Sequence, residues 1–366
     1  MRIAQVSPLC ESIPPHRYGG TERVVHFLTE ELVRRGHEVM LFASGDSRTS
    51  AELFPCVPEA LRLAGYDGDP TVPELIQLDQ VMDQLDRFDV LHFHTGASHY
   101  PLAQRLPVPH LNTLHGPLTA PDRAQLYRRF HQLPLVSISD AQRQPLPDAH
   151  WLGTVHHGLP LDLYQPVQTP RDYLAFVGRI SPEKRLDRAI AIAGQVGLPL
   201  KVAAKIDSSD QTYYSEHIAD LIAANPLVEF IGEVDDAGKQ ELMGHALALL
   251  FPIDWPEPFG LVMIEANACG TPVIAWRNGS TPEVIHPGIN GVLVDSIAEA
   301  VDAVRQVDRL DRQAIRHDFE QRFSVTRQAE QYEQLYRRLI ETHDSNGSHR
   351  PLQRPCSPRD PQLHAA

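Results

Sequence analysis

Short apolar runs and segments with helical spacing follow one another along the whole chain. Residues 3–6 form an apolar run that predicts a strand, and a loop rich in Pro and Gly follows at residues 14–20. Four apolar residues then recur with the spacing of one helical face: Val24, Val25, Leu28 and Leu32. The run at residues 38–43 predicts the next strand. Strand, loop, helix and strand in this order form the βαβ unit of a parallel sheet.

The same order recurs along the chain, with predicted strands at residues 90–94, 110–113, 135–138 and 151–156. A stretch rich in Pro follows at residues 158–170. A second βαβ unit begins beyond it, and its predicted strands are residues 174–177, 200–204, 228–231, 248–251, 272–275 and 291–294. The sequence therefore predicts an α/β protein with two doubly wound, Rossmann-like domains that face a central cleft.

The length and composition fit this organisation. Hydrophobic residues make up 42% and charged residues 22% of the 366 residues, which is ordinary for a globular protein of two or three domains. We expect the domains at residues 1–166 and 167–341, with the last helix packing back on the first domain. The segment at residues 342–366 is rich in Ser, Asn, Gly, Arg and Pro, which predicts a disordered tail.

An excess of acidic residues limits the partners that the chain can bind. The formal net charge of −14 leaves no general basic surface, so we expect no binding to nucleic acid. The basic, aromatic segment at residues 122–131 suggests at most weak peripheral membrane contact. The cysteines form no CxxC pair, and no run approaches the ~18 apolar residues of a membrane span. Because the N-terminal segment is also unlike a signal peptide, we expect a cytoplasmic protein.

Residues that follow the predicted strands are candidates for binding, because ligands of doubly wound domains lie at the carboxyl ends of the strands. Gly19 and Gly20 precede a helix N-terminus and suit a phosphate, although the GxGxxG spacing of a dinucleotide site is absent. Arg179 and Lys184 follow the first strand of the second domain, and two cations five residues apart can reach one diphosphate. An ordinary turn and a solvated loop are the alternative interpretations of these two segments.

The segment at residues 257–265 combines two carboxylates with a turn. A helix is predicted to begin near Gly260, so Glu257 is expected in the loop that faces the cleft. Glu265 is expected about two turns into the helix, on its ligand-facing side. A carboxylate that accepts two hydrogen bonds suits ribose or sugar hydroxyls, and the amides at residues 259–261 suit an anion. An amphipathic helix with one solvated Glu is the alternative.

Four segments stand out along the chain: GGTERVVHFLTEELVRRGHEV from residue 19, LHG at residues 114–116, VGRISPEK at residues 177–184, and the E-x7-E pair of Glu257 and Glu265. In this order they resemble the motifs of family 4 glycosyltransferases, which are retaining enzymes of the GT-B fold. The resemblance covers roughly residues 1–340.

The resemblance implies a role for each matching residue. Arg179 and Lys184 would neutralise the donor diphosphate, and Glu265 would bind the ribose hydroxyls. Glu257 and His115 would lie beside the transferred sugar as catalytic residues, although His115 also fits a structural turn. The other implied donor contacts are Gly19 and Gly20 under the diphosphate, the amides of Phe259, Gly260 and Leu261, and the base-contacting loop of Gly232, Glu233 and Val234.

The resemblance implies a hexosyltransferase-type enzyme that moves a sugar from a nucleotide-diphosphate sugar, by default a UDP-sugar, to an acceptor hydroxyl. Retention would follow from a front-face reaction in which the departing phosphate helps to deprotonate the acceptor. The product would be a glycan, a glycolipid or another glycoconjugate. The alternative is a non-transferase protein of the same fold, such as a nucleotide-sugar epimerase or a catalytically silent nucleotide-sugar-binding protein. A NAD-dependent dehydrogenase is disfavoured because the GxGxxG spacing is absent.

No metal or other cofactor is expected. Asp67-Gly68-Asp69 has the DxD spelling by which glycosyltransferases of the GT-A fold hold a divalent metal, but no apolar strand precedes it. Fixed cations and a helix N-terminus can stabilise the leaving diphosphate themselves. His92 and His94 alternate along a predicted strand and are interpreted as facing opposite sides, which excludes a shared metal.

Overall fold

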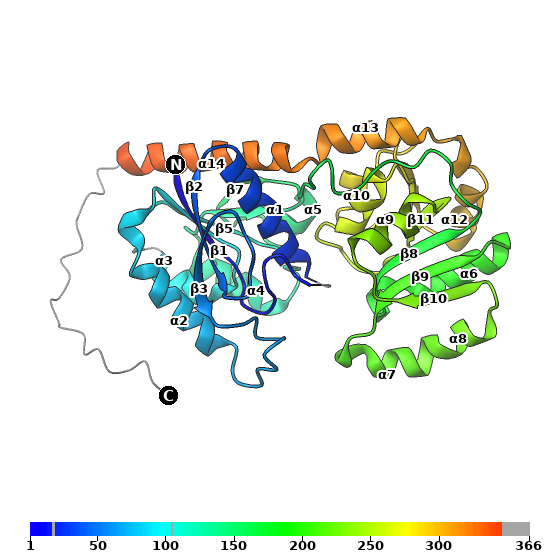
Figure 1. Ribbon diagram of the computed structural model, residues 1–366, viewed down its shortest axis with the longest axis horizontal. Coiled ribbons are helices and arrows are strands. Elements are labelled where there is room, and N and C mark those ends of the chain that lie inside the picture. The colour runs from blue at the N-terminus through cyan, green and yellow to red at the C-terminus, as the bar shows by residue number, and fades with distance from the viewer. Residues whose placement is uncertain (17–18, 104, 346–366) are drawn as a thin grey trace.

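Two parallel sheets, one in each half of the chain, form the framework of the molecule (Figure 1). The computed structural model describes residues 1–16, 19–103 and 105–345. Helices cover the faces of both sheets, and the two halves lie side by side along the long axis of the molecule (Figure 1). This arrangement confirms the two doubly wound α/β domains that the sequence predicts.

The sheet of the N-terminal domain has seven strands in the order β3-β2-β1-β4-β5-β6-β7, and each neighbouring pair is parallel. Alternate residues of β1 belong to different cores, with Ile3 on one face of the sheet and Ala4 on the other. Burial of both faces is typical of a parallel sheet. The strands are β1 (Arg2–Val6), β2 (Glu38–Ser44), β3 (Glu52–Val57), β4 (Val90–Phe93), β5 (His110–Thr113), β6 (Leu135–Ser137) and β7 (Trp151–Thr154).

The edge strand β3 is missing from the elements expected from sequence. Its apolar residues Leu53, Phe54, Cys56 and Val57 are interrupted by Pro55, and a proline inside an apolar run argues against a strand. Proline is tolerated at a sheet edge, where one side of the strand forms no ladder. The strand is held by parallel pairing with β2, in which Leu53 lies opposite Leu41.

The first helix follows the predicted pattern closely. All four apolar residues of the expected face are buried. The helix begins at Gly20, which was expected to precede it. Its buried face packs on the sheet, which fixes its N-terminus at the carboxyl end of β1. The helices of this domain are α1 (Gly20–Arg34), α2 (Thr71–Met82), α3 (Tyr100–Ala103), α4 (Pro121–Arg129) and α5 (Asp140–Arg143).

The sheet of the C-terminal domain has six parallel strands in the order β10-β9-β8-β11-β12-β13. The first strand runs two residues further than predicted, so Arg179 ends a strand instead of lying in a loop. The strands are β8 (Leu174–Arg179), β9 (Leu200–Lys205), β10 (Val228–Gly232), β11 (Ala248–Phe251), β12 (Val273–Trp276) and β13 (Gly291–Val294).

Helices pack on both faces of this second sheet, and each face has its own apolar core. The apolar face of the first helix of this domain, at residues 186–193, is buried in one of these cores. The helices are α6 (Leu186–Val196), α7 (Gln211–Tyr213), α8 (Ala219–Ala224), α9 (Asp236–Gly244), α10 (Leu261–Ala268), α11 (Thr281–Val284), α12 (Ile297–Val304) and α13 (Arg312–Arg322).

The last helix, α14 (Val325–Ser345), leaves the C-terminal domain and lies along the N-terminal one (Figure 1). It packs against α1 and β4, and Tyr332 and Tyr336 are buried there. The predicted tail was placed too early, because residues 342–345 belong to this helix. The rest of that tail lies outside the described residues. Within the described part of the chain, no helix is long and apolar enough to cross a membrane.

Candidate active site

A cavity of about 470 Å³ lies between the two domains, at the carboxyl ends of strands from both sheets. The N-terminal domain contributes residues that follow β1, β5 and β6, and the C-terminal domain contributes the ends of β8, β9 and β11. The switch points of both doubly wound sheets therefore open into one space, where ligands of such folds bind. Every predicted site residue except Gly232 lines this cavity: Gly19, Gly20, His115, Arg179, Lys184, Val234, Glu257, Phe259, Gly260, Leu261 and Glu265.

Gly232 ends β10 with a φ of 84°, in the left-handed region that favours glycine. This turn carries the chain from the sheet edge to Glu233 and Val234, which line the cavity themselves. The residue therefore shapes the loop that was expected to contact the base, without facing the cavity.

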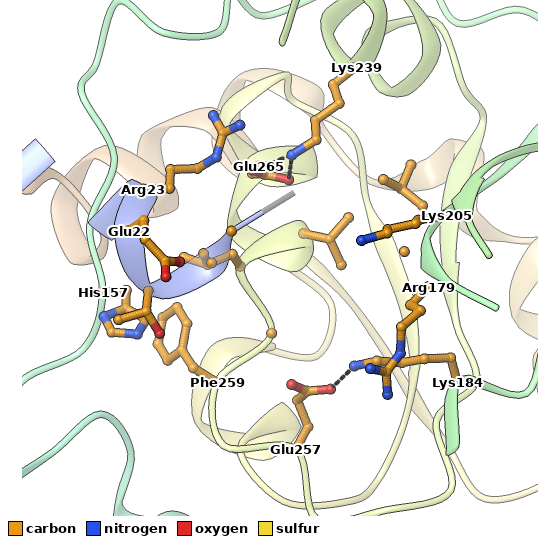
Figure 2. A pocket seen from close by; sticks show the side chains of 18 of the residues that line it. Glu22, Arg23, His157, Arg179, Lys184, Lys205, Lys239, Glu257, Phe259 and Glu265 are labelled. Atoms are coloured by element: carbon orange, nitrogen blue, oxygen red, sulfur yellow. Dashed lines mark hydrogen bonds and ion pairs between the residues drawn. The ribbon is translucent and has the colours of Figure 1, made fainter. Parts of the chain in front are cut away.

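Arg179 and Lys184 lie on one wall of the cavity, and each contacts a carboxylate (Figure 2). The Lys184 ammonium donates to Glu257 Oε2, and the indole of Trp255 donates to the same oxygen at 2.9 Å. Arg179 Nη2 lies 2.6 Å from Glu183 Oε1. The structure thus brings Lys184 and Glu257, which are far apart in sequence, into direct contact.

Two further lysines on this wall were missed in the sequence. Lys205 ends β9 and lies 3.3 Å from Asp207. Lys239 lies in α9, and its Nζ is 2.8 Å and 3.0 Å from the two carboxylate oxygens of Glu265. Three of the four lysines in the chain therefore line one cavity. The rarity of lysine in the sequence is the signal that could have pointed to them.

The loop before α10 places its first amides and Glu265 toward the cavity. Gly260 precedes the helix with a φ of 78°, in the left-handed region that favours glycine. The first amides of a helix have no acceptor within it, and they carry its positive end. Glu265 is 2% exposed and lies just over one turn into α10, not the two turns expected.

The glycine loop of the N-terminal domain lies across the cleft from α10. A Cβ on Gly20 would lie 3.8 Å from Leu261 Cδ1, so the starts of α1 and α10 approach each other closely. Arg23, one turn into α1, donates to both carboxylate oxygens of Asp236 at 2.7 Å each. The Tyr164 hydroxyl donates to the same carboxylate at 2.9 Å. This contact between the domains was not predicted, since nothing in either segment points to the other.

His115 follows β5 and is held by a chain of buried hydrogen bonds. Its Nε2 lies 2.9 Å from His94 Nδ1, and His94 Nε2 lies 2.7 Å from Gln5 Oε1. The Gln5 amide nitrogen donates to the Tyr336 hydroxyl, so Gln5 Oε1 is the acceptor and His94 carries its proton on Nε2. His94 Nδ1 then accepts from His115 Nε2, which leaves His115 Nδ1 as a lone-pair acceptor. Burial lowers the pKa of His115 to about 4, so the ring is neutral near pH 7.

The interpretation of His92 and His94 as facing opposite sides is wrong. Their ring centroids lie 3.9 Å apart, because residues two apart in a strand share a face. His92 is bound by the hydroxyls of Tyr336 and Thr113, both at 2.7 Å, so it serves the packing of α14.

No group of three or more His, Cys, Asp or Glu side chains in the described residues is arranged to hold a metal ion. Asp67-Gly68-Asp69 lies outside the cavity, before α2, where Asp69 Oδ1 accepts from the Thr71 amide at 2.9 Å.

Comparison with known proteins agrees with this geometry. Residues 18–151 match the family described as Glycosyltransferase Family 4, and residues 165–324 match Glycosyl transferases group 1. The chain is 26% identical over 351 residues to the D-inositol 3-phosphate glycosyltransferase of Mycolicibacterium smegmatis, covering 81% of this chain and 79% of the relative. It is 25% identical over 398 residues to the glycogen synthase of Mycobacterium tuberculosis, covering 91% and 94%.

Solved structures share the fold. A sucrose-phosphate synthase from Thermosynechococcus elongatus superposes with a TM-score of 0.76 at 20% identity, over 93% of this chain and 99% of that one. Anabaena HepE in complex with UDP and glucose gives a TM-score of 0.70 at 19% identity, over 92% and 99%. With both family models matched along the two domains that form the cavity, the chain belongs to glycosyltransferase family 4 and is a hexosyltransferase-type enzyme of the GT-B fold.

Proposed function

We propose that this enzyme transfers a hexosyl group from a UDP-sugar to an acceptor hydroxyl with retention of configuration, in the synthesis of a glycan, glycolipid or other glycoconjugate. The observation that carries the proposal is the cationic wall of the cavity, where Arg179, Lys184 and Lys205 lie with the first amides of α10. UDP is the proposed nucleotide, and the complexes of HepE with UDP and with UDP-glucose in the same fold support it.

The donor diphosphate would lie between Arg179, Lys184 and the start of α10. As the glycosidic bond breaks, negative charge grows on the diphosphate, and fixed cations and helix amides stabilise that charge where it forms. Glu265, fixed by Lys239, would accept hydrogen bonds from the ribose hydroxyls. These protein groups supply the stabilisation that a metal gives elsewhere, so we propose a reaction that is independent of metal.

Glu257 and His115 would contact the transferred sugar. Glu257 is fixed by Lys184 and by the Trp255 indole, and His115 offers a lone pair on Nδ1 to a sugar hydroxyl. Both groups orient the sugar, and the departing phosphate accepts the acceptor proton on the same face. Retention follows because acceptor and leaving group share that face.

Release of UDP from UDP-glucose, and of the corresponding nucleotides from GDP- and ADP-glucose, tests the proposal. We expect Arg179→Ala and Lys184→Ala to lower kcat/KM about 100-fold. Arg277→Ala is the matched control, because Arg277 is half-exposed and pairs with Asp295 away from the cavity. Wild-type rates in the two cavity variants would reject the site.

Three further outcomes of this assay bear on the finer parts of the proposal. Activity should persist in EDTA, and a loss restored by Mn²⁺ would favour a metal site instead. A preference for GDP- or ADP-glucose would replace UDP as the donor nucleotide. An altered sugar still attached to the nucleotide, or binding without turnover, would indicate an epimerase or a silent binding protein.

A further inference from the structure

The two walls of the cavity carry different charged groups. The C-terminal wall carries Arg179, Lys184, Lys205 and Lys239 together with three carboxylates. The N-terminal wall carries Glu11 and Glu22 together with Arg23 and Arg62. In Figure 2, Glu22, His157 and Phe259 lie on one side of the opening, and the cations Arg179, Lys184 and Lys205 lie on the other. An acceptor on the N-terminal side therefore meets a surface unlike the one that meets the donor diphosphate.

Glu22 is the distinctive group of this wall. It lies in the first turn of α1, is 7% exposed and lines the cavity. Its carboxylate accepts from its own backbone amide, and in the described part of the chain it forms no ion pair with another residue. Burial raises its pKa and the nearby Glu11 adds to this effect, whereas the hydrogen bond from its own amide and the charge of Arg62 act in the opposite direction. A carboxylate that lines a cavity and has few protein donors is available to accept hydrogen bonds from a ligand.

The cations near Glu22 are already engaged. Arg62 lies 2.7 Å from Glu11, and Arg23 donates to both oxygens of Asp236. His115 and His157 add no positive charge near pH 7, because burial lowers the pKa of both rings. Of the described carboxyl groups on this wall, Glu22 is thus the one without an ion pair, although the positive charge of Arg62 acts to lower its pKa. A phosphate placed here would meet a like charge in a site of low dielectric, where repulsion is strong.

We infer that this wall is an acceptor subsite for an uncharged polyhydroxyl compound, a sugar or polyol without phosphate, and that Glu22 accepts hydrogen bonds from its hydroxyls. The inference rests on the proposed glycosyl transfer and specifies its acceptor. Hydroxyls donate to Glu22 without adding charge. Phe259 and His157, whose ring centroids lie 4.9 Å apart, also line the cavity.

Matched acceptors test the charge preference on the wild-type enzyme. UDP release from the donor is measured with glucose against glucose 6-phosphate, and with myo-inositol against D-inositol 3-phosphate. We expect the neutral member of a pair to stimulate release at least tenfold more than its phosphorylated counterpart. A preference for the phosphorylated members, or no stimulation by either neutral compound, overturns the inference. Slow release of UDP to water, measured without an acceptor, reports the reaction of the donor alone. If this release is also absent, the proposed function fails, and not only the inference about the acceptor.

Variants of Glu22 test the contact itself. We expect Glu22→Gln to raise the KM for the neutral acceptor roughly 10- to 100-fold, with the donor KM and the release to water unchanged. Glu31→Gln is the matched control, because Glu31 is also buried in α1, at 6% exposure, but lies outside the cavity. If Glu22→Gln does not fold, Glu22→Asp tests the contact by withdrawing the carboxylate by one methylene group, and the same rise in the acceptor KM is expected.

Two results would give the N-terminal wall of the cavity a different role. A Glu22→Gln variant that loses thermal stability while keeping its acceptor KM would limit Glu22 to stabilising the helix N-terminus. An Arg62→Ala variant that loses the phosphorylated acceptor selectively would show that this wall binds phosphate. Either result overturns the inference.

Discussion

Lys239 Nζ lies 2.8 Å from Oε1 and 3.0 Å from Oε2 of Glu265, so one ammonium holds both oxygens of a carboxylate that is 2% exposed. The two residues come from different helices, α9 and α10, which approach each other at the cavity. A carboxylate fixed in this way keeps its remaining lone pairs in one direction, which suits the recognition of vicinal hydroxyls.

The first prediction concerns Lys239→Met. Without the ammonium, Glu265 loses the ion pair that fixes its orientation, so we expect the donor KM to rise at least tenfold. Kinetics of UDP-glucose turnover at several donor concentrations give this value. Lys201→Met is the matched control, because Lys201 pairs with Glu229 at 3.5 Å outside the cavity. An unchanged donor KM in Lys239→Met would remove Glu265 from the ribose site.

The lysines show what the sequence could and could not predict. Lys184 was found because it follows a recognisable strand and shares a segment with Arg179. Lys205 and Lys239 lie in other segments, and only the pairing of β8 with β9 and the packing of α9 bring them to the same wall. Local patterns identify residues at strand ends, whereas the composition of a wall depends on which strands are neighbours.

The same distinction holds for the fold. Strands buried on both faces gave apolar runs and were predicted within a few residues, but the apolar residues of the edge strand β3 are interrupted by Pro55. The contact of Arg23 with Asp236 depends on how two separately predicted domains meet, which neither pattern encodes. The error on His92 and His94 had a different origin, since the period of a strand already places them on one face.

The second prediction concerns the tautomer of His115. The hydrogen bonds through His94 and Gln5 require the proton on Nε2 and a free lone pair on Nδ1. Because the pKa of His115 is lowered to about 4, the ring stays neutral as pH rises from 6 to 8, and its ¹⁵N shifts should not change in that range. Nitrogen NMR of selectively labelled protein should give the Nε2-protonated pattern, and an Nδ1-protonated ring would contradict the network.

His94→Phe tests the same network by activity. The variant removes the acceptor of the His115 proton, so we expect kcat to fall about tenfold or more with little change in the donor KM. His94→Gln keeps an acceptor oxygen and should recover part of the rate, which a merely structural role of the ring does not predict.

The third prediction concerns acid stability and His99. This ring is stacked on Phe93, with centroids 4.0 Å apart, and burial lowers its pKa from 6.5 to about 3. The unfolded chain binds a proton below pH 6.5 and the folded one does not until about pH 3, so stability falls as the pH falls through this range. The contribution is about 1.4 kcal/mol per pH unit once the unfolded histidine is protonated.

Urea unfolding at pH 6.5 and pH 5 measures this effect. We expect His99→Phe to lose less stability between the two pH values than the wild type, whatever its absolute stability. His131→Phe is the control, since His131 is exposed and should leave the slope unchanged. Equal slopes in wild type and His99→Phe would show that the ring is protonated in the folded protein.

The last prediction concerns the contact between Arg23 and Asp236, which joins the two domains beside the cavity. Arg23 is 11% exposed in its side chain, and Asp236 begins α9, the helix that also carries Lys239. A change in this contact therefore alters both the approach of the domains and the position of the lysine that fixes Glu265.

We expect Arg23→Gln and Asp236→Asn each to lower kcat/KM for UDP-glucose about tenfold. If the two act through one contact, the double variant should lose little more than either single one, with a coupling energy of about 1–3 kcal/mol. The exposed pair of Arg277 and Asp295 provides the control cycle, where the expected coupling is about 0–1 kcal/mol. Additive losses at Arg23 and Asp236 would mean that the two residues serve separate ends of the cavity, and that closure of the domains does not depend on their contact.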